Sequence, residues 1–267
     1  HDSEFYRDLW NKLHTDGSFQ GEIINKKKNN QNYVQNVSIF TLKNEYNTIE
    51  NYFAIVSDIT QKHITQKKIS FYANFDSLTK LPNRHSFYEK LKSIAASSKR
   101  NQTKFALIYI DLDDFKKIND SLGHDYGDKL LIIFSSIIKR HLRQNDIFAR
   151  VGGDEFVIIM DNIKSINSVL RLYNRILKSL HEPIEIKSHH NHKINASFGI
   201  SIFPDDSTKI DELVKFADLA MYESKTLGKN RYTFYNNLFE QKLLKDIKLE
   251  QDILEGLKNN EFKIYLQ

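Results

Sequence analysis

Two glycines and two carboxylates interrupt a mostly apolar segment that spans residues 147–160. Apolar runs on both sides of a short polar interruption predict a β-hairpin, with Asp154 and Glu155 at its tip. Gly152 and Gly153 allow a ligand to approach the backbone closely. Glycine and aspartate are also common turn residues, so this stretch alone is equally compatible with an ordinary acidic turn.

A third acidic residue, Asp111, lies at the end of the apolar strand that we expect at residues 105–112. Alternation along this strand places Tyr109, Asp111 and Asp113 on one face, opposite the even-numbered apolar residues. If this strand neighbours the hairpin, Asp111 and Asp154 supply a pair of carboxylates. Mg²⁺ and other hard cations bind such oxygen ligands, commonly one or two carboxylates together with substrate phosphates.

Residues 115–128 separate these two acidic positions and are polar, with two glycines. Lys116 and backbone amides of this segment are suited to phosphate, whereas an asparagine and an aspartate can read the hydrogen-bonding edge of a nucleobase. Each signal is weak by itself, because aspartate at a strand end is commonly a cap and His124 is commonly a surface residue.

Composition limits the function classes. The chain has 267 residues, a net charge of +5 and an isoelectric point near 9.0. This positive charge is compatible with a polyanionic ligand. Since no long basic block stands out, we expect no nucleic-acid partner. The absence of cysteine excludes disulfides and cysteine-based nucleophiles or zinc sites. No apolar run approaches the roughly 18 residues of a membrane span, so we expect a cytoplasmic fragment, with any membrane anchor upstream.

Elements that position these residues follow from periodicity. Residues 1–60 predict a helix over Phe5 to Leu13 and then three short strands of a small antiparallel sheet. Residues 61–75 predict a linker helix, either solvated or paired with its copy in a dimer. Beyond residue 76, strands and helices alternate; helices are expected at 86–96, 128–142, 166–180 and 211–225, with a further strand at 194–203. Because the hairpin makes the sheet at least partly antiparallel, the expected fold class is layered α+β.

Motifs along residues 76–236 are similar to those of the GGDEF diguanylate cyclases. The matching segments are Asp76-x-Leu-Thr-x-Leu-Pro-Asn-Arg84, Asp111-Leu-Asp-Asp-Phe-Lys-x-Ile-Asn119, Gly123-His124-x-x-Gly-Asp128, Arg150-x-Gly-Gly-Asp-Glu-Phe156 and Ala220-Met-Tyr-x-x-Lys225-x-x-Gly-Lys-Asn230. The resemblance implies a nucleotidyl-cyclase-like fold, with a mainly antiparallel central sheet flanked by helices. It also implies condensation of two GTP molecules into cyclic di-GMP and two pyrophosphates across a homodimer.

The same resemblance assigns roles to residues. Asp111, the main-chain carbonyl of Leu112 and Asp154 would hold Mg²⁺ or Mn²⁺. Substrate GTP would be bound by Asn119 and Asp128 at guanine, His124 nearby, and Lys116, Lys225 and Lys229 at the phosphates. Asp154 and Glu155 would be catalytic, with Glu155 as a second metal ligand, a general base or a purely electrostatic group. Lys229 departs from the family, where arginine is usual, so bidentate phosphate binding is lost there.

Arg143 and Asp146 have the spacing of the family's inhibitory Arg-x-x-Asp site. An arginine fork and a carboxylate suit the phosphate and guanine edges of bound cyclic di-GMP. The other interpretation of this pair is a solvated helix end with a local ion pair.

Flanking segments carry two further resemblances. Residues 1–60, which close on Asp58-Ile59-Thr60, resemble the C-terminal part of a PAS sensor domain. Residues 237–267 resemble a linker and the truncated start of an EAL phosphodiesterase domain, without its catalytic motifs. The alternative function is therefore a GTP-binding regulatory domain that controls a downstream EAL domain. His189, His190 and His192 lie in a polar loop without a second ligand cluster, so we expect no metal there.

Overall fold

The computed structural model describes residues 3–186, 189–259, 261–262 and 265. The chain forms two compact units, His1–Ala73 and Asn74–Gln267. Within the part of the chain that the structure describes, no helix is long and apolar enough to cross a membrane.

The first unit contains helix α1 (Ser3–Asp16) and an antiparallel sheet of β1 (Ser18–Lys26), β2 (Asn32–Lys43) and β3 (Ile49–Asp58). Apolar residues of α1 pack on one sheet face and form a small core of Leu9, Leu13, Ile23 and Val37. Helix α2 (Thr60–Asn74) follows, and the Thr60 hydroxyl accepts a hydrogen bond from the Val34 backbone N–H at 2.9 Å. The predicted helix and small antiparallel sheet are confirmed, whereas their assignment to a PAS domain stays a prediction.

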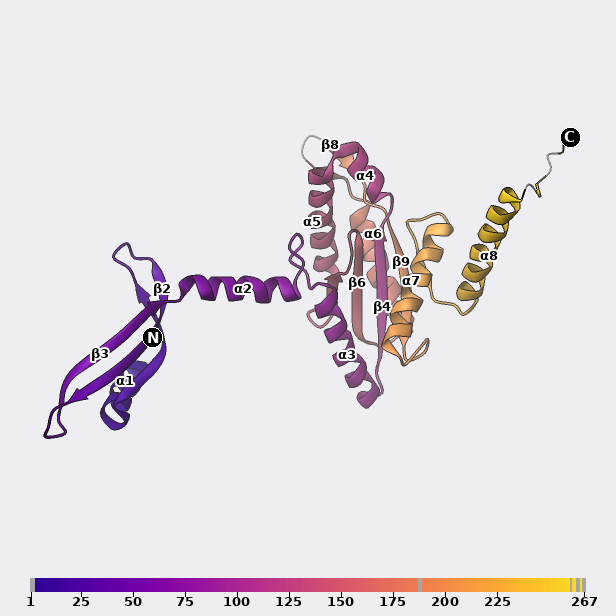
Figure 1. Cartoon of the computed structure of the whole chain (residues 1–267). Helices are drawn as coiled ribbons and strands as arrows, with labels where there is room; N and C mark the ends of the chain where they lie inside the picture. The colour runs from indigo at the N-terminus through magenta and orange to yellow at the C-terminus, as the bar shows by residue number, and fades with distance from the viewer. Residues whose placement is uncertain (1–2, 187–188, 260, 263–264, 266–267) are drawn as a thin grey trace. The chain divides into compact units, whose positions relative to one another are not determined.

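The second unit is built on a five-stranded sheet in the order β10-β9-β4-β6-β5, of which β9, β4 and β6 are labelled in Figure 1. These strands are β4 (Lys104–Leu112), β5 (Ile147–Arg150), β6 (Glu155–Ile163), β9 (Ala196–Phe203) and β10 (Tyr232–Phe234). Among the described pairs of this sheet, β10 and β9 are parallel, and β9–β4, β4–β6 and β6–β5 are antiparallel. The expected α+β fold with a mainly antiparallel central sheet is confirmed.

Helices cover both faces of this sheet, so its central strands are apolar on both sides. Even-numbered residues of β4 pack with α5 (His124–His141) and α6 (Ile166–Leu180). Odd-numbered residues Phe105 and Leu107 pack with α3 (Arg84–Asn101) and α7 (Ile210–Thr226). The remaining elements are β7 (Ile184–Ile186), β8 (His189–His192) and α8 (Leu238–Lys258).

Helix boundaries near the polar segment differ from the prediction. Residues 115–122 form a short helix, α4 (Phe115–Leu122), and α5 begins at His124 instead of residue 128. Gly123, with φ of +86°, ends the first helix and starts the second, so a continuous polar stretch is divided into two helices. Helix α3 also starts earlier than expected because the Asn83 side chain caps it, accepting a 3.0 Å hydrogen bond from the Ser86 backbone N–H.

Helix α7 lies directly on β9 at Gly199. A Cβ atom there would overlap the carbonyl oxygen of Ala217 and the backbone nitrogen of Met221. We expect Gly199→Ala to lower the free energy of unfolding by ~2 kcal/mol or more, because backbone atoms on both sides must move apart. Urea denaturation followed by circular dichroism measures this change. Gly153→Ala is the matched control, since a Cβ there meets nothing within 4 Å; equal stability of the two variants would contradict the prediction.

Candidate active site

An acidic centre forms where β4 ends beside the start of β6. Asp111 is paired with Glu155 in the antiparallel register, and the Leu112 backbone N–H donates to the carbonyl oxygen of Asp154 at 3.3 Å. The structure therefore brings together four predicted site residues from segments more than 40 positions apart in the sequence: Asp111 and Leu112 from one, Asp154 and Glu155 from the other. The hairpin tip is an acidic site at the sheet's end, beside a second carboxylate.

Lys225, in the last turn of α7, supplies the nearest positive charge. Its Nζ lies 2.8 Å from Asp111 Oδ1, and the side chain of Asp111 is only 10% exposed. Burial raises the pKa of Asp111 to about 6; the negative charges of Asp154 and Glu155 add to this rise, and Lys225 opposes it. Negative charge is thus in excess here, and a cation would stabilise it.

The donor set fits Mg²⁺ or Mn²⁺. Among the residues that the structure describes, no group of three or more histidine, cysteine, aspartate or glutamate side chains could hold a metal ion by itself. Asp111, Asp154 and the main-chain carbonyl of Leu112 offer the oxygen donors that would suit a hard cation, which commonly also binds phosphates and water. The site therefore suits a cation that arrives with a phosphorylated substrate.

Tyr109, on the sheet face that carries Asp111, holds the Glu155 carboxylate by a hydrogen bond. Its hydroxyl donates to Glu155 Oε2 at 3.1 Å, and burial, together with the negative Glu155, raises the pKa of this phenol. A Cβ at Gly152 would lie 2.6 Å from the same carboxylate oxygen, so the glycine leaves room for this arrangement. Sequence reasoning missed Tyr109, although alternation had placed it on the face of Asp111.

Arg150 holds the hairpin tip in place. Its Nη1 lies 2.9 Å from Asp76 Oδ1, and its Nε and Nη2 donate to the Gly153 carbonyl oxygen at 3.0 and 2.7 Å. Asp76 also accepts hydrogen bonds from the backbone N–H and the hydroxyl of Thr79. The turn at residues 76–79 and the tip are therefore clamped together. The sequence motifs included Asp76 and Arg150, but without a role for either.

A second lysine, Lys229, lies in the loop between α7 and β10. Lys229 Nζ lies 2.9 Å from Asp114 Oδ2, and Lys117 Nζ lies 2.8 Å from the other oxygen, Asp114 Oδ1. Lys229 and Asn230 both have positive φ, at 62° and 47°. The buried Asp113 carboxylate stabilises this conformation, because it accepts the Asn230 backbone N–H at 2.8 Å. Sequence reasoning assigned no role to Asp113; its signal was a second acid, after Asp111, on the same face of the expected strand.

The predicted guanine-binding residues lie on α4 and α5. Asn119 faces Gly127, where a Cβ would overlap Asn119 Oδ1; among the described residues, this buried oxygen has no hydrogen-bond partner. The side chains of Lys116, His124 and Asp128 are exposed. No described contact joins these four side chains to the acidic centre. The chain itself links them, because α4 begins four positions after Asp111.

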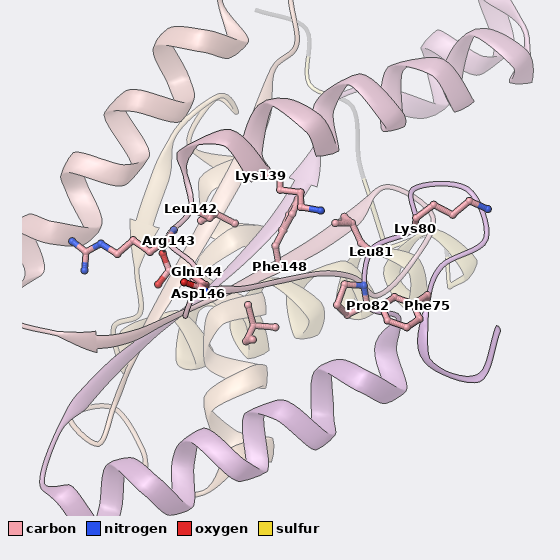
Figure 2. Close-up of a pocket in the computed structure, with 11 residues that line it drawn as sticks. Phe75, Lys80, Leu81, Pro82, Lys139, Leu142, Arg143, Gln144, Asp146 and Phe148 are labelled. Atoms are coloured by element: carbon pink, nitrogen blue, oxygen red, sulfur yellow. Dashed lines mark hydrogen bonds between the residues drawn. The ribbon is translucent and has the colours of Figure 1, made fainter. Parts of the chain in front are cut away.

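Arg143 and Asp146 line a hollow of about 400 Å³ at the C-terminal end of α5 (Figure 2). Phe75 and Pro82 lie at the opposite end of this hollow, with Lys139 between. A second hollow of about 390 Å³ also includes both residues, together with arginines and an asparagine of α6. The Arg143 backbone N–H donates to Asp146 Oδ2 at 2.9 Å, and burial raises the pKa of Asp146. Arg143 is exposed, so its guanidinium group is accessible to a ligand.

The three histidines of the sequence analysis belong to β8, as His189, His190 and His192. Their side chains lie outside the part of the chain that is described, so the expectation of no metal there stays a prediction.

Comparison with known proteins places residues 73–231 in one family. The family model described as "Diguanylate cyclase, GGDEF domain" matches these residues. The chain is 34% identical over 192 residues to the bifunctional diguanylate cyclase/cyclic di-GMP phosphodiesterase MucR of Pseudomonas aeruginosa, covering 72% of this chain and 28% of MucR. It is 32% identical over 214 residues to the cyclic di-GMP phosphodiesterase NbdA of the same organism, covering 80% and 27%. The chain thus spans little more than a quarter of these curated relatives.

Solved structures agree with this placement. The GGDEF domain of TpbB from Pseudomonas aeruginosa superimposes with a TM-score of 0.62 at 32% identity, covering 64% of this chain and 99% of that one. The coiled coil and GGDEF domain of DgcB from Caulobacter crescentus, in complex with c-di-GMP, gives 0.59 at 27% identity, covering 66% and 93%.

The raised pKa of Asp111 predicts a pH-dependent stability. Between about pH 4 and pH 6 the folded protein binds more protons at this group than the unfolded chain does, so the stability contributed by Asp111 falls as pH rises. Asp111→Asn removes this effect. Relative to wild type, the variant should gain ~3 kcal/mol of unfolding free energy between about pH 4 and pH 7.

Urea titrations in metal-free buffer at each pH measure this gain. Asp120→Asn, at an exposed position of α4, is the control and should show no such trend. A difference between Asp111→Asn and wild type that stays constant with pH would refute the prediction.

Proposed function

The chain belongs to the GGDEF diguanylate cyclase family, and on that premise we propose that it condenses two GTP molecules into cyclic di-GMP and two pyrophosphates. The observation that carries this proposal is the acidic centre of Asp111, Asp154 and Glu155, with Lys225 beside it. Carboxylates for a divalent cation and ammonium groups for a triphosphate are the parts that phosphoryl transfer requires.

In this proposal Asp111, the Leu112 carbonyl and Asp154 hold Mg²⁺ or Mn²⁺. The bound cation would neutralise charge developing on the phosphate and lower the pKa of the attacking ribose 3′-hydroxyl. Glu155 acts beside it, as a second ligand, a general base or a fixed charge. Tyr109 keeps the Glu155 carboxylate in one orientation for any of these roles.

Binding of GTP is assigned to two groups of residues. Lys116, Lys225 and Lys229 would contact the phosphates, and Asp113 orients the backbone next to Lys229. Asn119 and Asp128 would bind guanine, with His124 nearby. Asn119 Oδ1 is buried and has no partner within the described part of the chain, which supports this assignment, because a guanine N–H would relieve an unpaired acceptor that costs about 1–3 kcal/mol.

Each chain offers one such site, whereas the reaction joins two nucleotides. A homodimer with facing sites would therefore align each 3′-hydroxyl with the opposite α-phosphate. Cyclic di-GMP would then bind at Arg143 and Asp146 and inhibit synthesis. The exposed arginine at the meeting of two hollows supports this part of the proposal.

A second candidate function is supported by the relatives. NbdA carries the name of a phosphodiesterase, and Lys229 stands where the family usually has arginine. The domain would then bind GTP and regulate an EAL phosphodiesterase domain that begins in residues 237–267. Residues 1–60, as the end of a PAS domain, would supply the signal through the linker helix in either case.

Incubation with GTP and Mg²⁺ or Mn²⁺ separates the two functions. We expect cyclic di-GMP, detected by chromatography and mass spectrometry, and a loss of at least about 100-fold in rate for Asp154→Asn, because one carboxylate ligand of the cation is removed. Melting temperatures of both proteins check that they fold. A dimeric sample that binds GTP but forms no cyclic dinucleotide would overturn the cyclase and favour the regulatory domain.

Arg143→Ala tests the product site. Loss of a charged hydrogen-bond donor should weaken cyclic di-GMP binding about tenfold or more, as measured by calorimetry, and should raise the product concentration at which synthesis stops. Arg100→Ala, in the last turn of α3, is the matched control. Equal affinity of Arg143→Ala and the control would remove Arg143 from the site.

A further inference from the structure

Lys225 is paired with an oxygen of Asp111, one of the proposed metal ligands. Its Nζ lies 2.8 Å from Asp111 Oδ1, with the lysine side chain 33% exposed and the aspartate side chain 10% exposed. Both a lysine ammonium and a divalent cation are attracted to such an oxygen. Side by side in a partly buried site they would repel each other, because water and salt screen such charges poorly there.

We propose that Lys225 makes metal binding depend on the nucleotide, by neutralising Asp111 until a triphosphate draws the ammonium away. This inference rests on the proposed function for the assignment of Asp111 to metal and Lys225 to phosphate. Without nucleotide, a cation must compete with Lys225 for Asp111. With GTP bound, Lys225 pairs with phosphate and leaves Asp111 to the cation.

The surroundings of Lys225 allow this exchange. The neighbouring Ser224 is buried, and its hydroxyl donates to the Phe198 carbonyl oxygen at 2.7 Å, so the backbone of α7 is fixed to β9. The four-carbon stem of lysine can still turn its ammonium group between two anions. The partial negative charge at the C-terminal end of α7 keeps a cation favourable in either position.

Binding free energies require this effect to be reciprocal. If the nucleotide raises metal affinity by a given factor, the metal raises nucleotide affinity by the same factor. The site would therefore fill with metal and nucleotide together and hold little metal alone.

Lys229 offers an internal comparison. It carries the same charge and senses Asp111 electrostatically, but its Nζ pairs with Asp114, which is not a proposed metal ligand. Removal of either lysine changes the net charge equally. Only removal of Lys225 frees an oxygen of Asp111.

The experiment measures Mn²⁺ affinity by electron paramagnetic resonance, without nucleotide and with a non-hydrolysable GTP analogue. Lys225→Met should bind Mn²⁺ alone about tenfold more tightly than wild type, a factor within the usual range of coupling between sites. Without nucleotide, the Mn²⁺ affinity of Lys229→Met should stay within about twofold of the wild-type affinity. In wild type the analogue should raise Mn²⁺ affinity, and this rise should shrink in Lys225→Met.

Unchanged Mn²⁺ affinity in Lys225→Met, an equal gain in Lys229→Met, or no Mn²⁺ binding by either variant would overturn the inference. Lys225→Gln provides the same comparison if the methionine variant does not fold. A wild-type protein that fails to bind the GTP analogue would refute the proposed function instead, while the affinities for Mn²⁺ alone would still decide the role of Lys225.

Discussion

Electrostatic repulsion among carboxylates at the end of β4 and the start of β6 is the constraint on which the site depends. Antiparallel pairing places Asp111 opposite Glu155, and the tip adds Asp154. Burial intensifies this repulsion, since water cannot screen the charges. Lys225 offsets part of it, and a hydroxyl group from Tyr109 satisfies Glu155. The centre is thus arranged to attract a cation, and the hydrogen bond from Tyr109 holds the Glu155 carboxylate in one orientation.

The rest of the second unit keeps this arrangement rigid. Helices on both sheet faces bury the central strands, and α7 approaches β9 so closely that only glycine fits at position 199. Arg150 ties the tip to Asp76 at the start of the unit, and Asp113 holds the backbone beside Lys229. Charged groups held in place before the substrate arrives need little reorganisation during a reaction. The packing that stabilises the sheet therefore also holds the site residues in place.

Lys225 and Lys229 are each paired with a different carboxylate. Because of this difference, we expect their removal to affect metal affinity differently. Lys225 pairs with a proposed metal ligand, whereas Lys229 pairs with Asp114 on the surface. Exposed pairs such as the second contribute little, because solvent screens them. The proposed control of metal binding by nucleotide therefore rests on the partly buried pair of Lys225 and Asp111. The same helix, α7, would then couple the phosphates to the cation.

The sequence by itself determined the strand at residues 105–112, the hairpin, helix α6 at its observed bounds and the family resemblance, because these depend on local periodicity and spacing. It also placed Asp111 at a strand end and Asp154 at the tip of the hairpin. Only the tertiary structure decided which side chains meet: the contacts of Tyr109 with Glu155 and of Arg150 with Asp76 join residues 46 and 74 positions apart. Such contacts follow from strand register and helix packing, which no local pattern specifies.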